Sequence, residues 1–173
     1  MRILKLAFPF LFILSFCPRE IHAQEEVPIG LFVYNFTRLF DWPESAKTGN
    51  FVIQVVGHQS VYNELTKLTQ GKKVGAQNII VQHTMDVEQL NTAAHIIFVG
   101  HWQSRHLPAI LGKVGTKPCL VVTEAEGLLD QGSGLNFIIR ENKLVFEVKP
   151  ATIAKANIKT DRRVLELAYR VAD

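Results

Sequence analysis

The sequence predicts an α/β fold: a single three-layer domain with a mixed, mostly parallel sheet, a C-terminal antiparallel hairpin and closing helices. Apolar, β-branched runs alternate with segments of helical periodicity, an order typical of parallel strands that are covered on both faces. Those runs lie at 51–56, 78–82, 95–99 and 119–123. Two later runs, 135–140 and 144–148, are separated by Glu141-Asn142-Lys143 alone, which is hairpin spacing. The 173 residues contain no internal repeat and no linker, so we expect one domain.

Residues 1–23 have the composition of a secretory signal peptide. Arg2 and Lys5 precede an apolar run at 6–16, and a more polar segment follows and ends in Ala23. The apolar run is shorter than the ~18–20 residues of a membrane span, so an uncleaved anchor is the weaker interpretation. We expect export, cleavage after Ala23 and a mature domain of residues 24–173.

A lipid anchor is a further alternative for this segment. Cys17 follows Leu14-Ser15-Phe16, a context similar to a lipid-attachment site. Phe16 is bulkier than the residue usual at that position, so we favour the cleaved signal peptide.

The first element of the mature chain should be an aromatic helix over residues 29–43. Its apolar residues recur in steps of three or four, as one face of a helix requires. They are Ile29, Phe32, Val33, Phe36, Leu39 and Phe40. Pro43 should end the helix, because proline cannot donate a backbone hydrogen bond and disfavours helical geometry in the residue before it. We interpret the stripe as core packing; a helix that binds a partner's groove is the alternative.

Shorter helices should connect and follow the strands, at 60–68, 87–90, 104–114, 150–156 and 160–171. A glycine-rich loop precedes the hairpin, and Gly127, Gly132 and Gly134 permit unusual backbone angles there.

The charge of the mature chain argues against nucleic acid as a partner. Removing residues 1–23 takes away three of the 19 basic and one of the 16 acidic side chains, leaving 16 and 15 and a formal net charge of +1. A nearly neutral domain provides no electrostatic reason to bind nucleic acid or an anionic membrane.

The mature chain also retains one cysteine, Cys119, so it cannot form an internal disulfide. Its apolar context predicts a buried, inert thiol, with an intermolecular bridge as the alternative.

Searches for catalytic or metal-binding patterns find no complete motif. His101 and His106 are five residues apart, which does not place them on one helical face, so exposed loop histidines are a better interpretation than a metal site. The carboxylates of Glu124, Glu126 and Asp130 could serve acid–base chemistry, but surface solvation explains them more simply.

The segment Gly132-Ser133-Gly134 matches neither of two glycine-containing functional motifs, the nucleophile elbow and the phosphate-binding loop. It lacks the first glycine of a nucleophile elbow, and it lacks the Gly-Lys-Ser/Thr ending of a phosphate-binding loop.

Trp102, together with His101 and Arg105, forms an aromatic and basic cluster after a strand end. It is either a contact surface or a capped loop.

The chain resembles the YfiR family in a series of short motifs. These are Phe32-Val33-Tyr34-Asn35-Phe36, Phe40-Asp41-Trp42-Pro43, Gly71-Lys72-Lys73, Gly132-Ser133-Gly134-Leu135-Asn136-Phe137, Val145-Phe146-Glu147-Val148, Asn157-Ile158-Lys159-Thr160 and Arg163-Val164-Leu165-Glu166-Leu167-Ala168. They keep the family's order over residues 27–171.

The resemblance implies a periplasmic α/β regulator without catalytic activity or cofactor. The best-known members repress a membrane-bound diguanylate cyclase by binding its periplasmic sensor part, which lowers cyclic di-GMP and biofilm formation. For this chain it implies an inner-membrane partner, either a diguanylate cyclase or a histidine kinase, and leaves a homodimer open. The candidate partner contacts are Trp102, Arg105 and His101. The motif residues Tyr34, Asn35, Trp42, Pro43, Gly132, Gly134 and Asn136 are interpreted as structural.

Two departures from the family and two other functions bear on this interpretation. Ser133 replaces a glycine of the family loop, and the lone Cys119 argues against the redox control that cysteine pairs provide in the best-studied members. A small-molecule-binding module is the main alternative, with its site at the glycine-rich loop and the strand ends. A hydrolase ranks third, because no nucleophile–base pair is found.

Overall fold

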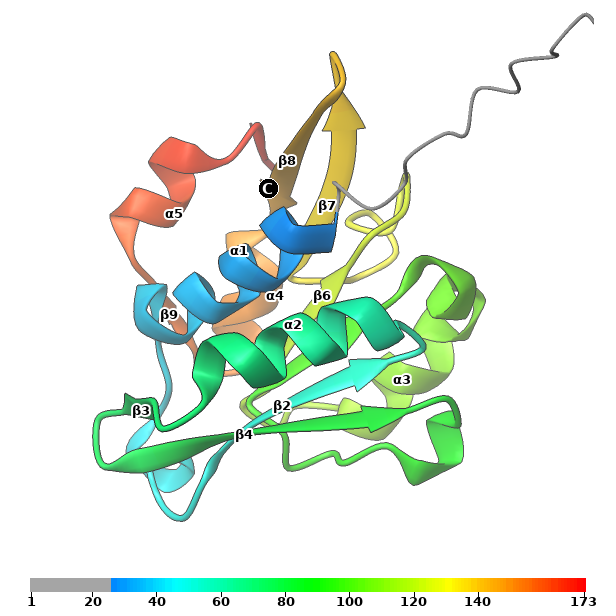
Figure 1. Ribbon diagram of the computed structural model, residues 1–173. Coiled ribbons are helices and arrows are strands. Elements are labelled where there is room, and N and C mark those ends of the chain that lie inside the picture. Colours follow the sequence, from blue (N-terminus) through cyan, green and yellow to red (C-terminus); the bar gives the residue numbers. More distant parts are fainter. Residues whose placement is uncertain (1–25) are drawn as a thin grey trace, which may run out of the picture.

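The computed structural model describes the backbone of residues 26–173 and the side chains of residues 29–173. Within that range an eight-stranded sheet lies between two layers of helices, which confirms the predicted three-layer α/β domain (Figure 1). No helix of the described part has the length and apolar character needed to cross a membrane. The predicted signal peptide and its cleavage site lie outside the described residues.

The centre of the sheet is parallel, as the apolar runs predict. The strand order is β10-β8-β7-β6-β5-β2-β4-β3. The parallel strands are β2 (Phe51–Val56), β4 (Gln77–Thr84), β5 (Ile96–Val99), β6 (Leu120–Thr123) and β7 (Leu135–Arg140). After β2 the chain goes outward to β4 and then crosses back over β2 to form β5 on its other side, so the direction of winding reverses between β2 and β5.

The remaining strands close the two ends of the sheet. β8 (Lys143–Val148) pairs antiparallel with β7, which confirms the predicted hairpin. Its turn residues Glu141 and Asn142 have φ values of 51° and 58°, the positive pair that a tight hairpin turn requires. β10 (Arg170–Val171) adds in parallel to β8, and β3 (Lys73–Val74) pairs antiparallel with β4.

Helices cover both faces, and the strand residues alternate between two apolar layers. α1 (Glu26–Leu39) and α2 (Gln59–Thr69) lie side by side on one face, while η4 (His101–His106) and α3 (Leu107–Val114) cover the other (Figure 1). In β5, Ile96 and Phe98 face the first layer, and Ile97 and Val99 face the second. The other elements are η2 (Glu44–Ala46), η3 (Val87–Gln89), α4 (Pro150–Lys155), α5 (Arg162–Leu167), β1 (Phe40–Asp41) and β9 (Lys159–Thr160).

The aromatic stripe of α1 is part of the core, as predicted. Phe36 is buried and its ring lies 6.0 Å from that of Phe137 and 5.5 Å from that of Phe146. Phe32 contacts the same two rings, at 5.6 and 5.9 Å. The helix is thereby fixed against the hairpin by ring contacts that each contribute beyond the apolar area they bury.

The end of α1 differs from the prediction. The helix stops at Leu39 rather than at Pro43, and Phe40 and Asp41 form β1, which pairs with Thr160 and Lys159. Phe40 is still buried, so the apolar periodicity reports burial correctly while the backbone has already left the helix. Pairing with a strand more than a hundred residues away decides the local conformation here.

The closing helix is also shorter than predicted. Instead of covering 160–171, α5 ends at Leu167, and Arg170–Val171 forms β10 along β8. Tyr169 N donates to Phe146 O and Ala172 N to Val148 O, both at 2.8 Å. These bonds satisfy an edge of the sheet, which a continued helix would leave open.

Candidate functional site

A cavity of about 550 Å³ opens where the parallel strands β2, β5 and β6 end. The residues that follow these strands meet at it: His58 after β2, His101 after β5 and Glu124 after β6. In an open α/β sheet, ligands bind outside the carboxyl ends of the strands, at the point where the winding reverses. The cavity adjoins that point, between β2 and β5.

Two glycines allow the loops after β2 and β5 to approach each other. Gly57 has φ 72°, and a Cβ on it would lie 2.2 Å from Cγ of Gln103. A Cβ on Gly100 would lie 3.0 Å from Cβ of His58 and 3.1 Å from the carbonyl oxygen of Gly57. A side chain at Gly100 would press on His58 and on the loop after β2, whereas one at Gly57 would displace the side chain of Gln103 and would have to adopt a positive φ.

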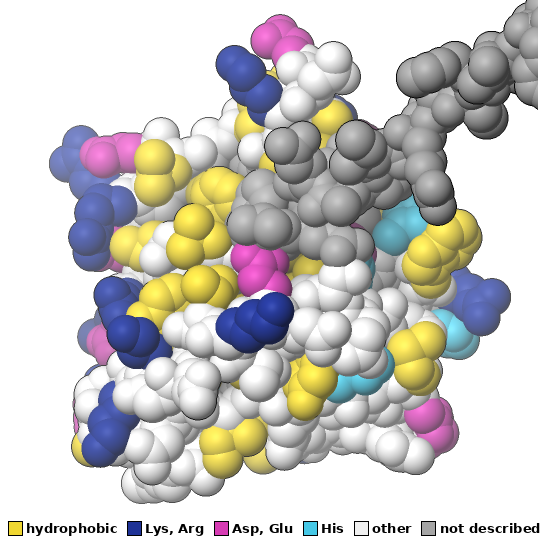
Figure 2. Space-filling model, in the orientation of Figure 1, with side chains coloured by type: hydrophobic (Ala, Val, Ile, Leu, Met, Phe, Trp, Pro, Cys, Tyr) yellow, Lys and Arg dark blue, Asp and Glu magenta, His cyan; other side chains and the backbone are white. Residues whose placement is uncertain are grey.

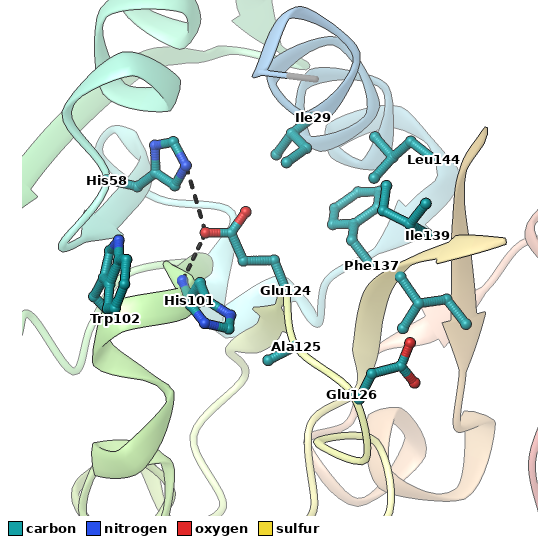
Figure 3. Close-up of a pocket in the computed structure, with 11 residues that line it drawn as sticks. Ile29, His58, His101, Trp102, Glu124, Ala125, Glu126, Phe137, Ile139 and Leu144 are labelled. Atoms are coloured by element: carbon teal, nitrogen blue, oxygen red, sulfur yellow. Dashed lines mark hydrogen bonds and ion pairs between the residues drawn. The ribbon is translucent and has the colours of Figure 1, made fainter. Parts of the chain in front are cut away.

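Glu124 connects the two histidine loops. Its Oε1 accepts a hydrogen bond from the backbone N–H of His101 at 2.6 Å and lies 3.4 Å from Nε2 of His58 (Figure 3). The Nδ1 of His58 accepts from the N–H of Val61 and caps α2, so in the neutral ring the proton is on Nε2, which faces the carboxylate. The side chain of Glu124 is only 11% exposed, so the prediction that it is a solvated surface group is wrong.

The opposite wall of the cavity is apolar. Ile29 of α1, Phe137 and Ile139 of β7 and Leu144 of β8 lie across from the histidines and Glu124 (Figure 3). The cavity therefore joins a hydrogen-bonding end to an apolar end, which is the composition typical of sites for small organic ligands.

The three candidate partner contacts all lie on η4, at the mouth of this cavity or beside it. Trp102 is 81% exposed, and its ring packs edge-on against His101 at 5.3 Å. His101 and Trp102 line the cavity. Arg105 lies further along η4, where its Nε donates to Nε2 of His106. Figure 2 shows histidine, hydrophobic and basic side chains together along this edge of the molecule.

The motif residues near α1 have different surroundings. Trp42 is buried against Phe51, with ring centroids 4.9 Å apart, and its Nε1 has no hydrogen-bond partner within the described part of the chain. Tyr34 is half-buried and its hydroxyl accepts from the guanidinium of Arg38. Asn35 is exposed. The half-buried Pro43 precedes the first turn of η2.

Asn136 is the centre of a buried polar ladder across the end of the sheet. Its Oδ1 accepts from the hydroxyl of Thr123 at 2.7 Å, and its Nδ2 donates to Oε2 of Glu147 at 3.1 Å. Glu147 in turn accepts from Nε of Arg170 in β10 at 2.7 Å. Ser133, which replaces a family glycine, lies buried at this ladder with its hydroxyl 3.1 Å from that of Thr123.

The two motif glycines act in different ways. Gly132 has φ 109°, as the prediction of an unusual backbone angle requires. Gly134 does not have a positive φ, so that prediction is wrong for it. It lies in a closely packed position instead, since a Cβ there would lie 3.0 Å from Cγ1 of Ile153 and 3.1 Å from Cδ1 of Leu120.

Other predicted groups are separated from the cavity or buried. His95, at the start of the predicted strand 95–99, is buried: its Nδ1 accepts from Val52 N at 3.1 Å and its Nε2 lies 2.7 Å from Ala46 O. Burial lowers the pKa of His95 and raises that of the Cys119 thiol to about 12, as expected of an inert cysteine. Among the side chains of residues 29–173, no group of three or more His, Cys, Asp or Glu is arranged so that it could hold a metal ion.

The two exposed carboxylates of the loop are engaged in ion pairs. Glu126 pairs with Arg140 at 2.5 Å, and Asp130 with Arg170 at 3.3 Å. The hydrogen bond from Arg140 is the main cause of the lowered pKa of Glu126.

Sequence reasoning missed His58 and the low exposure of the Glu124 side chain. A usable signal existed: Gly57-His58 and Gly100-His101 are the same dipeptide after two neighbouring parallel strands. Because parallel strands end at the same edge, that repetition predicts two histidines side by side.

Comparison with known proteins places the chain in a family. None of the curated proteins matches it significantly. One solved structure with a detectable likeness is a candidate NADP oxidoreductase from Bacteroides fragilis, at 14% identity and a TM-score of 0.35, over 72% of this chain and 60% of the other. A likeness that weak supports no inference about this protein. The model of the YfiR/HmsC-like family, in contrast, matches residues 30–169, so the chain belongs to the YfiR/HmsC-like family of periplasmic regulatory proteins.

Proposed function

We propose that this protein is exported to the periplasm, binds the periplasmic sensor part of an inner-membrane signalling protein, and represses it. The partner is a diguanylate cyclase, or a membrane sensor of similar architecture such as a histidine kinase. Family membership over residues 30–169 is the observation that carries the proposal, because the family acts through a membrane signalling partner.

The mechanism requires only binding. A regulator that binds the inactive conformation of a sensor more tightly than the active one shifts the population toward the inactive state. About 1.4 kcal/mol of differential affinity changes the ratio of the two states tenfold. No catalytic group is needed for this effect.

The rim formed by His101, Trp102 and Arg105 is our candidate for the contact surface. Trp102 is 81% exposed although it is the largest apolar side chain of η4. Tryptophan and arginine are the residue types enriched among interface positions that dominate binding energy. A partner that covers Trp102 would bury its ring without any rearrangement of the core.

The test is reconstitution with a defined partner. The purified protein is mixed with the periplasmic domain of each membrane cyclase and kinase of its host, and affinities are measured by surface plasmon resonance. We expect one domain to bind, with Trp102→Ala weakening it by about 2 kcal/mol or more. Leu167→Ala is the matched control, because Leu167 is 66% exposed on α5 and lies outside the rim.

The functional readout is cyclic di-GMP in cells that carry the identified cyclase. Deletion of the gene for this protein should raise cyclic di-GMP, and re-expression should lower it. If no host sensor domain binds, and deletion leaves both cyclic di-GMP and biofilm unchanged, the proposal is wrong.

A further inference from the structure

We propose that the cavity at the ends of β2, β5 and β6 is a binding site for a small organic cation, with its ammonium group at Glu124 and its apolar body along β7 and β8. The ligand site does not depend on the regulatory function proposed above. The effect of a bound ligand on the partner does depend on that function, since His101 and Trp102 belong both to the cavity and to the candidate contact surface.

The charge at the polar end selects against anions. In open α/β folds this position commonly holds a phosphate or carboxylate, bound by main-chain N–H groups at the start of a helix. Here the protein's own carboxylate takes one such donor: Glu124 accepts from the N–H of His101, at the start of η4, and lies beside His58, whose own ring caps α2. An anionic ligand would meet a like charge at short range.

The same carboxylate favours a cation. The negative charge of a carboxylate attracts an ammonium group, and a hydrogen bond between the two is of the strong, charge-assisted kind. Trp102 and His101 stand at the same end, and the face of an indole ring attracts a cation within about 6 Å. The pairing of carboxylate and aromatic ring is suited to an amine and unsuited to a phosphate.

The apolar wall determines the rest of the ligand. Phe137, Ile139 and Leu144 line the side opposite Glu124, and Ile29 adds the first described turn of α1 (Figure 3). Ile139 is 40% exposed, so part of this wall contacts solvent and would gain by being covered. An aryl or alkyl chain attached to the ammonium group would lie along it.

The cavity is large enough for such a molecule. A volume of about 550 Å³ falls within the ~300–1,000 Å³ of sites for small organic ligands. Its walls come from α1, the loop after β2, η4, the loop after β6 and the hairpin, so an occupant would hold together elements that are distant in sequence.

Three probes with the same body and different end groups test the proposal: 4-phenylbutylamine, 4-phenylbutanol and 4-phenylbutyrate. Binding of each to the purified protein, expressed with its own N-terminal segment, is measured by isothermal titration calorimetry. We expect the amine to bind about tenfold or more tightly than the alcohol, since hydrogen bonds to charged groups are the stronger ones. The carboxylate should bind most weakly.

Variants assign the contact. Glu124→Gln should weaken the amine about ten- to a hundredfold and leave the alcohol nearly unchanged, and Trp102→Ala should weaken the amine about two- to fivefold. Glu126→Gln is the matched control, because that carboxylate also lines the cavity but is paired with Arg140. Circular dichroism and melting curves establish that each variant is folded.

The outcomes separate the two proposals. If the amine does not bind at about 10 mM, or binds no better than the alcohol, or is indifferent to Glu124→Gln, the ligand site is refuted whatever the partner. If the amine binds as expected but no sensor domain does, the ligand site stands and the regulatory function fails.

Discussion

Replacing Asn136 by alanine should destabilise the fold far more than its size suggests. The side chain is fully buried, and it makes hydrogen bonds to Thr123, to the N–H of Ala125 and to the carboxylate of Glu147, at 2.7, 3.3 and 3.1 Å. Each neutral bond contributes about 1 kcal/mol, and the bond to the charged Glu147 about 1.5–3 kcal/mol. Alanine removes all three, so we expect a loss of about 3–5 kcal/mol in the free energy of unfolding.

The assay is urea denaturation, followed by far-UV circular dichroism and by tryptophan fluorescence. In thermal denaturation of the same variant, the melting temperature should fall by about 6–20 °C, at about 2–4 °C per kcal/mol for a chain of this size. A change in the midpoint without a change in the slope would show that stability alone is altered.

Asn35→Ala provides the matched control. Asn35 belongs to the same set of family-motif residues and carries the same side chain, but it is exposed on α1. Alanine is the better helix former, so this variant should be unchanged or more stable by up to about 0.7 kcal/mol. If Asn136→Ala costs less than about 1 kcal/mol, or no more than the control, the ladder does not stabilise the sheet as argued.

Three other perturbations address acid stability, the thiol and the hairpin. Burial lowers the pKa of His95 from 6.5, so as the pH falls the unfolded chain binds the extra proton first. The contribution of His95 to the free energy of unfolding should therefore be constant above pH 6.5 and fall below it. In urea titrations at several pH values, His95→Gln should remove that fall. Cys119 is buried and its pKa is raised to about 12. At pH 8 a disulfide reagent should therefore label the native protein about a hundredfold more slowly than the protein in urea, and equal labelling rates would contradict the burial of the thiol. Changing Glu141-Asn142 to Asn-Gly should stabilise the hairpin by about 0.5–1 kcal/mol, because both positions have positive φ; a loss of stability on denaturation would show that Glu141 has a role beyond the turn.

The parallel core could be predicted from the sequence because burial on both faces leaves a direct pattern. A run such as that at 51–56 is apolar throughout, and its place in β2 follows from local composition. The errors occur where distant pairing overrides local periodicity. Phe40 fits the helical stripe and is buried, yet it lies in β1 because β9 supplies hydrogen bonds there. Val171 fits a helical face and is exposed in β10 for the same kind of reason.

The cavity was harder to predict because its parts come from five separate segments. Trp102 and His101 were found from composition, since an aromatic residue and a basic residue after a strand end are visible in the sequence. Glu124 was misinterpreted because spacing does not report burial. Its carboxylate contacts the loops that follow β2 and β5, and the meeting of those loops depends on the order of strands in the sheet.

The position of Glu124 bears on both proposals at once. The carboxylate of Glu124 takes the N–H of His101 after β5, a type of donor with which open α/β sheets bind phosphates, and places a negative charge there. This edge also carries an apolar wall and the exposed ring of Trp102, both of which are suited to recognition. Because Trp102 lines the cavity and also stands out from it, an occupied cavity and a bound sensor would compete for the same ring. A regulator with that arrangement could be released by a ligand without a change of fold, since the ligand need only differ in its affinity for the free and the sensor-bound protein.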